Sequence, residues 1–249
     1  MKYIKYYEVA QSDFDAIESF YVKDNLCPKV WENDNQINTD VREQLLTIAQ
    51  DFYNSTDLEA EIKDVTLTGS LANYNWSETY SDYDVHILID FSEINDDLEL
   101  VKKYVDAIKN NWNKTYDIKV EGYEVEVYIQ SIDEKHRSSG VYSLLNDKWN
   151  IRPSKVDFIP DEETIREKAK TVMMMVNDLE KDLEKDNYKE FTDKIKKVWD
   201  KIRRYRKSGL DSESGEYSTG NLVFKLLRRN GYIGKILDMR RKSYENQFE

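Results

Sequence analysis

The stretch Val65–Phe91, VTLTGSLANYNWSETYSDYDVHILIDF, decides how this chain is expected to fold. It begins with a short β-prone run that stops at Gly69, and a second, more apolar run extends from Asp84 to Ile89. Two such runs separated by a polar, aromatic connection are typical of two strands joined by a turn and a loop. We therefore expect a strand, a turn, a loop and a second strand here.

Two carboxylates stand at the start of the second strand. Asp82 and Asp84 are two residues apart, so their side chains leave the same face, with Cα atoms roughly 7 Å apart. Carboxylates placed this way repel each other unless a cation lies between them, and Mg²⁺ binds carboxylate and phosphate oxygens. Gly69 would let a backbone N–H approach a phosphate closely, and Ser70 would add a hydroxyl donor. The pattern predicts a metal seat beside a phosphate site; the alternative is an inert, polar strand start.

The same residues carry a resemblance to a known family. Gly69–Ser70, a loop, and Ser81–Asp84 entering the apolar strand Val85–Ile89 resemble the signature of the DNA polymerase β-like nucleotidyltransferase superfamily. The resemblance implies an α+β fold with a polymerase β palm-like mixed sheet and flanking helices. It also implies Mg²⁺ or Mn²⁺ as cofactor, an NTP such as ATP as substrate, and a third acid on a neighbouring strand. Gly69, Ser70 and Ser81 would then bind the nucleotide.

The loop departs from the family pattern in two respects. Eleven residues separate Ser70 from Asp82, where the family has about ten before its Ser-Asp-x-Asp, and Tyr74 stands where a glycine is common. We therefore expect Asn73 or Asn75 to take the left-handed conformation in its place. The segment ANYNW before SDYDVH also resembles a subgroup of nucleotidyltransferases from tailed bacteriophages.

A candidate for the third acid lies on a later strand. We expect a hairpin around Glu121–Gly122, with strands over 116–120 and 123–130. In the second strand the apolar residues alternate with Glu124, Glu126, Tyr128 and Gln130. An acid in mid-strand flanked by valines is unusual without a partner, because burying an unpaired carboxylate is costly. Glu126 is the candidate metal ligand, and Glu124 competes on the same face. The alternative is a solvent-facing edge strand with alternating acids.

Helical periodicity flanks these strands and fills the C-terminal third. A helix is expected from an N-cap at Thr39 to about Asn54, and a second over 95–111 with Leu98 facing inward. After Pro160, Asp161 should cap a long helix that pairs with a helix over 188–207, and Ser218 should begin a third that ends at Asn230–Gly231. We expect a nucleotidyltransferase catalytic domain over 1–160, with 1–60 as its N-terminal helical part. A helical C-terminal domain over 161–249 should follow, with a cleft between the two.

Composition limits the classes of function. The chain has 249 residues and a net charge of −12. Residues 1–160 carry −15, whereas residues 161–249 carry +3. So acidic a chain is not expected to grip double-stranded nucleic acid over an extensive surface. It has no signal peptide core or long apolar run, so we expect a cytoplasmic protein without membrane contact. With one cysteine, Cys27, and two histidines, neither a disulfide nor a usual zinc site is expected.

Several further residues allow two interpretations. His86 shares the face of Asp82 and Asp84 and is either a metal ligand or base, or a hydrogen-bonded neighbour. The basic run over 194–207 is either a phosphate-binding surface or a solvated helix face. Other possible nucleotide contacts are His136, Arg137, the turn Ser138–Gly140, Arg152, Lys155, Arg203 and Arg206.

The function expected from these residues is transfer of a nucleoside monophosphate from an NTP to a hydroxyl, with two-metal-ion catalysis and release of pyrophosphate. The acceptor, whether a small molecule, a protein side chain or an RNA end, is not specified by the motif. The alternative, from a different class, is a catalytically inactive nucleotidyltransferase fold that serves as a binding or assembly module.

Overall fold

The computed structural model describes residues 11–33, 35–134, 138–182 and 188–248, which divide into two compact units. One unit is Val22–Asp157. The other consists of the described parts of Met1–Tyr21 and Phe158–Glu249. The N-terminal segment therefore groups with the C-terminal helices, whereas the sequence-based boundary at residue 160 assigned it to the catalytic domain.

The unit Val22–Asp157 is built on a six-stranded mixed sheet in the order β5-β6-β4-β3-β7-β8. Its strands are β3 (Ile62–Thr68), β4 (Tyr83–Ile89), β5 (Lys119–Val120), β6 (Tyr123–Ser131), β7 (Val141–Ser143) and β8 (Lys148–Ile151). Strands β4 and β6 are parallel and are connected through α2 (Leu98–Thr115), and the other neighbours are antiparallel. A small separate hairpin pairs β1 (Trp31–Glu32) with β2 (Gln36–Ile37). The expected mixed α+β architecture is confirmed.

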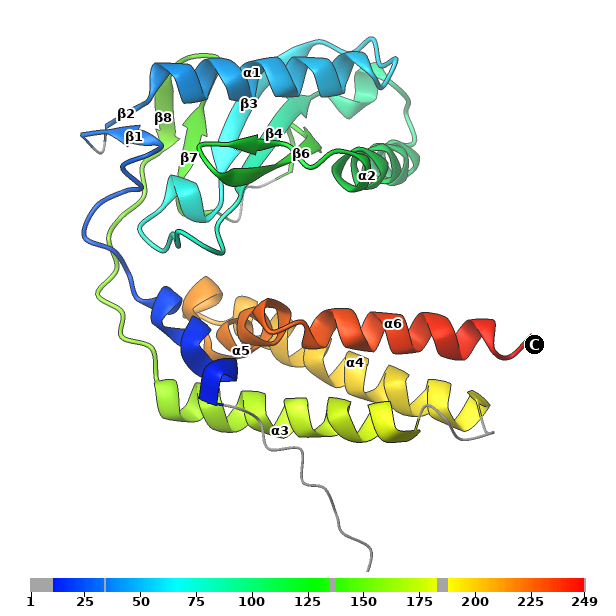
Figure 1. Cartoon of the computed structure of the whole chain (residues 1–249). Helices are drawn as coiled ribbons and strands as arrows, with labels where there is room; N and C mark the ends of the chain where they lie inside the picture. Colours follow the sequence, from blue (N-terminus) through cyan, green and yellow to red (C-terminus); the bar gives the residue numbers. More distant parts are fainter. Residues whose placement is uncertain (1–10, 34, 135–137, 183–187, 249) are drawn as a thin grey trace, which may run out of the picture. The chain divides into compact units, whose positions relative to one another are not determined.

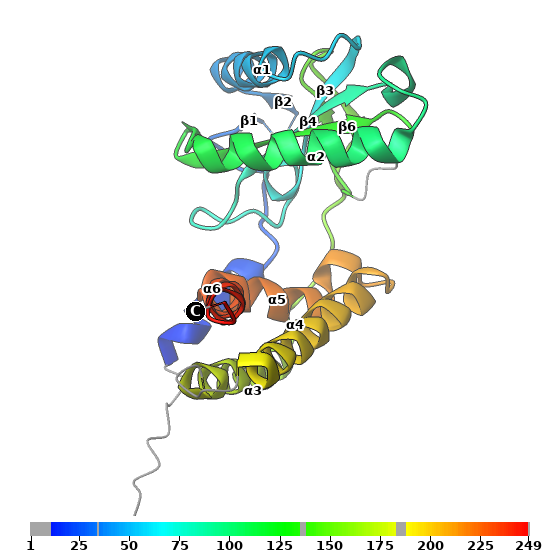
Figure 2. The same ribbon diagram turned by 90° about the vertical axis from the view of Figure 1, so that its right-hand side faces the viewer.

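Two helices cover one face of this sheet. Helix α1 (Thr39–Asn54) and α2 lie against the sheet in Figures 1 and 2. Every second residue of β4, beginning with Tyr83, is fully buried on that face. These residues share one apolar cluster with Leu45 and Phe52 of α1 and Val105 of α2. Burial of alternate residues beneath helices fixes which way the intervening polar side chains point, namely to the opposite face.

Two details at the helix ends differ from the prediction. Asn38, not Thr39, caps α1, because its side-chain oxygen accepts from the backbone N–H of Asp40 at 2.9 Å and of Val41 at 3.4 Å. Asn accepts such bonds at least as well as Thr, so the sequence signal was shifted by one residue. Leu98 is exposed rather than inward, since it is the first residue of α2 and lies before the face that packs on the sheet.

The predicted turn between β5 and β6 is confirmed, and a second turn joins β7 to β8. Glu121 and Gly122 have φ of 50° and 87° and join β5 to β6. Asp147, with φ of 51°, lies in the turn between β7 and β8. Positive φ at these positions matches the right-handed twist of the strands that a tight hairpin must join.

The second unit is helical in its described part. Its helices are α3 (Glu162–Asp182), α4 (Tyr188–Leu210), α5 (Thr219–Arg229) and α6 (Tyr232–Glu245), and a 3₁₀ segment at Gln11–Phe20 packs on α5. Helices α3 and α4 run in opposite directions side by side (Figure 1), as expected. The Asp161 and Ser218 caps are confirmed. Helix α6 was not predicted: Gly231, with φ of 75°, ends α5 but also allows the chain to begin a new helix at once.

The cores of both units are ordinary. Met173 of α3 is completely buried, and Cys27 is a buried free thiol. Among the described helices, none combines the length and the apolar character that crossing a bilayer requires.

Candidate functional site

The polar side chains of the central strands lie on the sheet face opposite α1 and α2. The register pairs Asp84 of β4 with Glu126 of β6 on one side and with Thr68 of β3 on the other. Laterally paired residues share a face, and neighbouring strands are about 4.8 Å apart, so the two acids, distant in sequence, become immediate neighbours. Glu124 belongs to a different row: it pairs with Lys119 of β5, and its side chain is 66% exposed.

Gly69 lies directly against the carboxylate of Asp84. Its φ of 75° and ψ of −159° belong to a region that is essentially restricted to glycine. A Cβ added to Gly69 would lie 1.9 Å from Oδ2 of Asp84, so any side chain here would displace that carboxylate. The N–H of Gly69 donates to Oγ of Ser138 at 3.3 Å. The predicted phosphate-approach residue and the predicted acid are therefore in contact, and the Ser138 turn closes over the Gly69 backbone.

Ser70 and Ser81 are brought together by the loop that separates β3 from β4. Their hydroxyl oxygens are 2.8 Å apart, and Ser81 also accepts from the N–H of Ser77 at 2.8 Å. Asp82 follows immediately and precedes the first residue of β4. The expectation that Asn73 or Asn75 would be left-handed is wrong: Asn73 is extended, with φ of −150°, and Asn75 has no positive φ. Gly69 itself takes the positive φ, so the turn is made before the loop rather than within it.

The N-terminal part of this unit holds that loop in place. The indole N–H of Trp31 donates to the carbonyl of Leu71 at 2.7 Å, and the N–H of Lys23 donates to the carbonyl of Tyr74 at 2.7 Å. Trp31 is buried, and its ring stacks on Trp149 with centroids 4.5 Å apart. No pattern in the sequence indicated this role for Lys23 and Trp31, because it consists of contacts between distant segments.

Tyr128 lies at the centre of the interactions around the predicted acids. Its hydroxyl donates to Oε2 of Glu126, and its ring lies between the His86 ring, with centroids 4.8 Å apart at 14°, and the Lys109 ammonium, 4.8 Å from its centroid. Burial raises the pKa of the Tyr128 phenol, and the negative charges of Asp84, Glu126 and Asp82 raise it further. All three predicted acids therefore act on one phenol.

Tyr128 could have been suspected from the alternation of β6, which places it on the face of Glu126. No signal in the sequence pointed to Lys109, which reaches the ring from α2.

His86 is a hydrogen-bonded neighbour in this arrangement. Its Nδ1 lies 2.7 Å from Oε1 of Gln130, and the Gln130 amide nitrogen donates to the carbonyl of Glu134 at 3.2 Å. Because the amide nitrogen is committed to Glu134, Oε1 faces His86 and accepts from it, so Nδ1 carries the proton. The ring is thereby fixed in its stack on Tyr128.

The residues present fit a hard divalent cation in chemistry. Asp84 and Glu126 offer adjacent carboxylate oxygens on one face, with Asp82 two residues before Asp84, and oxygen is the donor that Mg²⁺ and Mn²⁺ prefer. Within the described ranges, no three His, Cys, Asp or Glu side chains are already gathered around one point that could hold an ion. Glu126 is turned to Tyr128 instead, so it would have to exchange this hydrogen bond for a metal contact.

The other predicted nucleotide contacts are dispersed. Lys155 forms an exposed ion pair with Asp24, and Lys194 of the basic run pairs with Glu190 at 3.0 Å along α4. Arg206 donates to Asn221 and stacks on Phe224, and burial lowers the pKa of its guanidinium. His136 and Arg137 lie outside the described residues. The solvated-face interpretation of the basic run thus holds for Lys194.

Comparisons with known proteins give little to build on. No family model matches the chain, and no curated protein matches it. Among solved structures, one of a STING-associated CdnE c-di-GMP synthase from Capnocytophaga granulosa is similar at 9% identity and a TM-score of 0.23, over 85% of this chain and 84% of that chain. A likeness of this size carries no argument about activity.

Proposed function

We propose that this chain is a nucleotidyltransferase that moves a nucleoside monophosphate from an NTP to a hydroxyl acceptor, with Mg²⁺ or Mn²⁺. One observation carries the proposal: the β4–β6 register places Glu126 beside Asp84, whose carboxylate lies against the Gly69 backbone. Two neighbouring acids beside a glycine turn with serine hydroxyls provide metal ligands and phosphate donors in one place.

Each residue has a distinct role in this proposal. Asp82, Asp84 and Glu126 would hold the cation, which when bound neutralises phosphate charge and lowers the pKa of the attacking hydroxyl. Gly69 would bring its backbone close to the triphosphate, and Ser70 and Ser81 would donate hydrogen bonds to phosphate oxygens.

Glu126 has a second task in the same proposal. Its carboxylate would accept the proton of the acceptor hydroxyl as the new phosphodiester or phosphoester bond forms and pyrophosphate leaves. Tyr128 would orient that carboxylate, because the phenol donates to it and the ring is held between Lys109 and His86.

The acceptor is limited by charge. Residues 1–160, which contain the site, carry −15, so a long nucleic acid would be repelled. A small molecule, a protein side chain or a locally gripped RNA end are the classes of acceptor that this charge admits.

The test is pyrophosphate release from each of the four NTPs with Mg²⁺ or Mn²⁺. We expect Asp84→Asn to lower the rate at least 100-fold, because it removes a charged ligand. Glu124→Gln, an exposed acid of the same face and strand as Glu126, should change it less than twofold. Equal rates for wild type and Asp84→Asn would refute the proposal.

One observation favours a second candidate function, an inactive fold that binds nucleotide without turning it over. The hydrogen bond from Tyr128 occupies the carboxylate that should complete the metal site. This candidate predicts Mn²⁺-dependent NTP binding in calorimetry with no pyrophosphate released from any NTP across acceptors. Release that depends on Asp84 would exclude it.

A further inference from the structure

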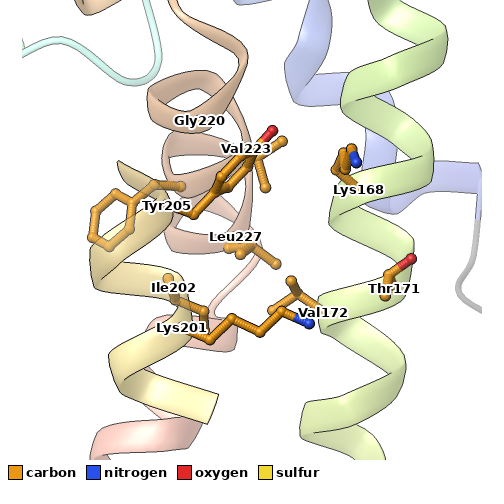
Figure 3. Close-up of a pocket in the computed structure, with 10 residues that line it drawn as sticks. Lys168, Thr171, Val172, Lys201, Ile202, Tyr205, Gly220, Val223 and Leu227 are labelled. Carbon is orange, nitrogen blue, oxygen red and sulfur yellow. The ribbon is translucent and has the colours of Figure 1, made fainter. Parts of the chain in front are cut away.

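The helical unit contains a cavity that takes no part in the proposed reaction. It has a volume of about 310 Å³ and lies between α3, α4 and α5. Figure 3 shows Val172, Ile202, Val223 and Leu227 converging on it from the three helices. An apolar space of this size falls within the range of small-molecule sites, which begins near 300 Å³. It is about twice the volume of the ~150 Å³ apolar cavity that accepts one benzene.

Two lysines place positive charge at the rim of this apolar cavity. Lys168 of α3 and Lys201 of α4 line the cavity and are exposed. In the described part of the chain, neither takes part in an ion pair, whereas Lys181 of α3 pairs with Asp178 and Lys194 of α4 pairs with Glu190. Figure 3 shows Lys201 extending from α4 toward α3 beneath the apolar side chains. The cavity therefore combines an aliphatic interior with two ammonium groups at its edge.

The other polar groups that line the cavity restrict the chemical class of the ligand further. The hydroxyl of Thr171 already donates to the carbonyl of Glu167 at 2.9 Å, and the lining has no arginine. A phosphate is bound best by several donors or by the fork of an arginine, whereas a carboxylate can be neutralised by lysine ammonium groups acting as point charges. A single anionic head group on an aliphatic chain matches what is present.

We propose that this cavity binds a free medium-chain carboxylate, with its alkyl chain among Val172, Ile202 and Leu227 and its head group at Lys168 and Lys201. If each carbon of the chain takes roughly 30 Å³, which is the volume of one water molecule in the liquid, the cavity holds a chain of about ten carbons. Decanoate is therefore the probe. The inference does not depend on the nucleotidyltransferase proposal, since every residue belongs to the helical unit.

The test is calorimetric titration of the full chain with decanoate and octanoate below their micelle concentrations, and with decanol below its solubility limit. Decanoate should bind, and octanoate should bind about 15-fold more weakly, because each buried methylene is worth about fourfold in affinity. Decanol, which has the same chain without the charge, should bind about twofold to thirtyfold more weakly, which is the effect of losing two exposed ion pairs.

A matched pair of double variants isolates the two lysines. Lys168→Gln with Lys201→Gln should weaken decanoate binding about twofold to thirtyfold. Lys170→Gln with Lys196→Gln removes the same charge from exposed positions of the same two helices that do not line the cavity, and should change the affinity less than twofold. Circular dichroism of both double variants should match that of the wild type.

Three outcomes would overturn the proposal. The first is no decanoate binding by the wild type, and the second is equal weakening in the two double variants. The third is concentration-dependent self-association in sedimentation that decanoate leaves unchanged and Val223→Glu abolishes, because the apolar groove would then be an interface between copies of the chain.

Discussion

Replacing Gly69 by alanine should damage the site far more than its small size suggests. The new Cβ would lie 1.9 Å from Oδ2 of Asp84, whereas ordinary contacts begin at 3.4 Å, so the carboxylate must retreat by at least 1.5 Å. The backbone conformation itself costs about 1–3 kcal/mol for a residue with a Cβ. A displacement of this size at a reacting centre reduces rates by roughly 100-fold. We therefore expect a stable but nearly inactive variant.

Gly122→Ala is the matched control for this change. Gly122 also has a positive φ, 87°, but a Cβ there would meet nothing within 4 Å. The control should lose about 1–2 kcal/mol of unfolding free energy from backbone strain and keep its activity within twofold. The comparison separates backbone strain from displacement of Asp84.

Two measurements check the Gly69 prediction. Urea unfolding with and without Mn²⁺ should show stabilisation of the wild type and of Gly122→Ala by about 2.7 kcal/mol at an ion concentration of 100 Kd, and little for Gly69→Ala. Pyrophosphate release should follow the same order. If Gly69→Ala retains the Mn²⁺ response and activity of Gly122→Ala, the carboxylate of Asp84 is not where the ion binds, and the reasoning fails.

Three further predictions concern stability. Asp84→Asn should raise the unfolding free energy by about 1 kcal/mol in EDTA. Two carboxylates roughly 5 Å apart repel by about 1–3 kcal/mol for effective dielectric constants between 80 and 20. A lower unfolding free energy for the variant in urea titration would contradict the pairing with Glu126. Tyr128→Phe should reduce the loss of unfolding free energy above pH 10. A phenol whose pKa is raised on folding stabilises the folded state fully below its ordinary pKa near 10, and this stabilisation is lost as the pH rises toward the folded pKa. Equal alkaline unfolding curves for the variant and the wild type would refute this prediction. Trp31→Phe should lower the unfolding free energy by about 2–4 kcal/mol, because it leaves the buried Leu71 carbonyl without its hydrogen-bond donor and opens a cavity. A decrease below 0.5 kcal/mol in thermal unfolding, which is typical of ordinary surface sites, would show that the loop does not depend on Trp31.

The sequence by itself determined the elements and the identity of the candidate acids. The apolar run Asp84–Ile89 and the alternation over 123–130 predicted both central strands, each to within one residue of its observed bounds, and the face on which Asp84 and Glu126 lie. Helical spacing predicted α1, with its start one residue after the observed one and its end at about Asn54 as observed. These features are local: each depends on which side chains recur every two or every 3.6 residues, and this information is contained in a short window.

Only the tertiary structure decided which of these residues meet. The parallel register of β4 and β6 chose Glu126 over Glu124 as the neighbour of Asp84, and it placed Tyr128 beside both. The contact of Gly69 with Asp84 likewise joins residues on different strands. Strand register and contacts between elements are set by how all the apolar faces pack at once, so no periodicity within a single segment contains them.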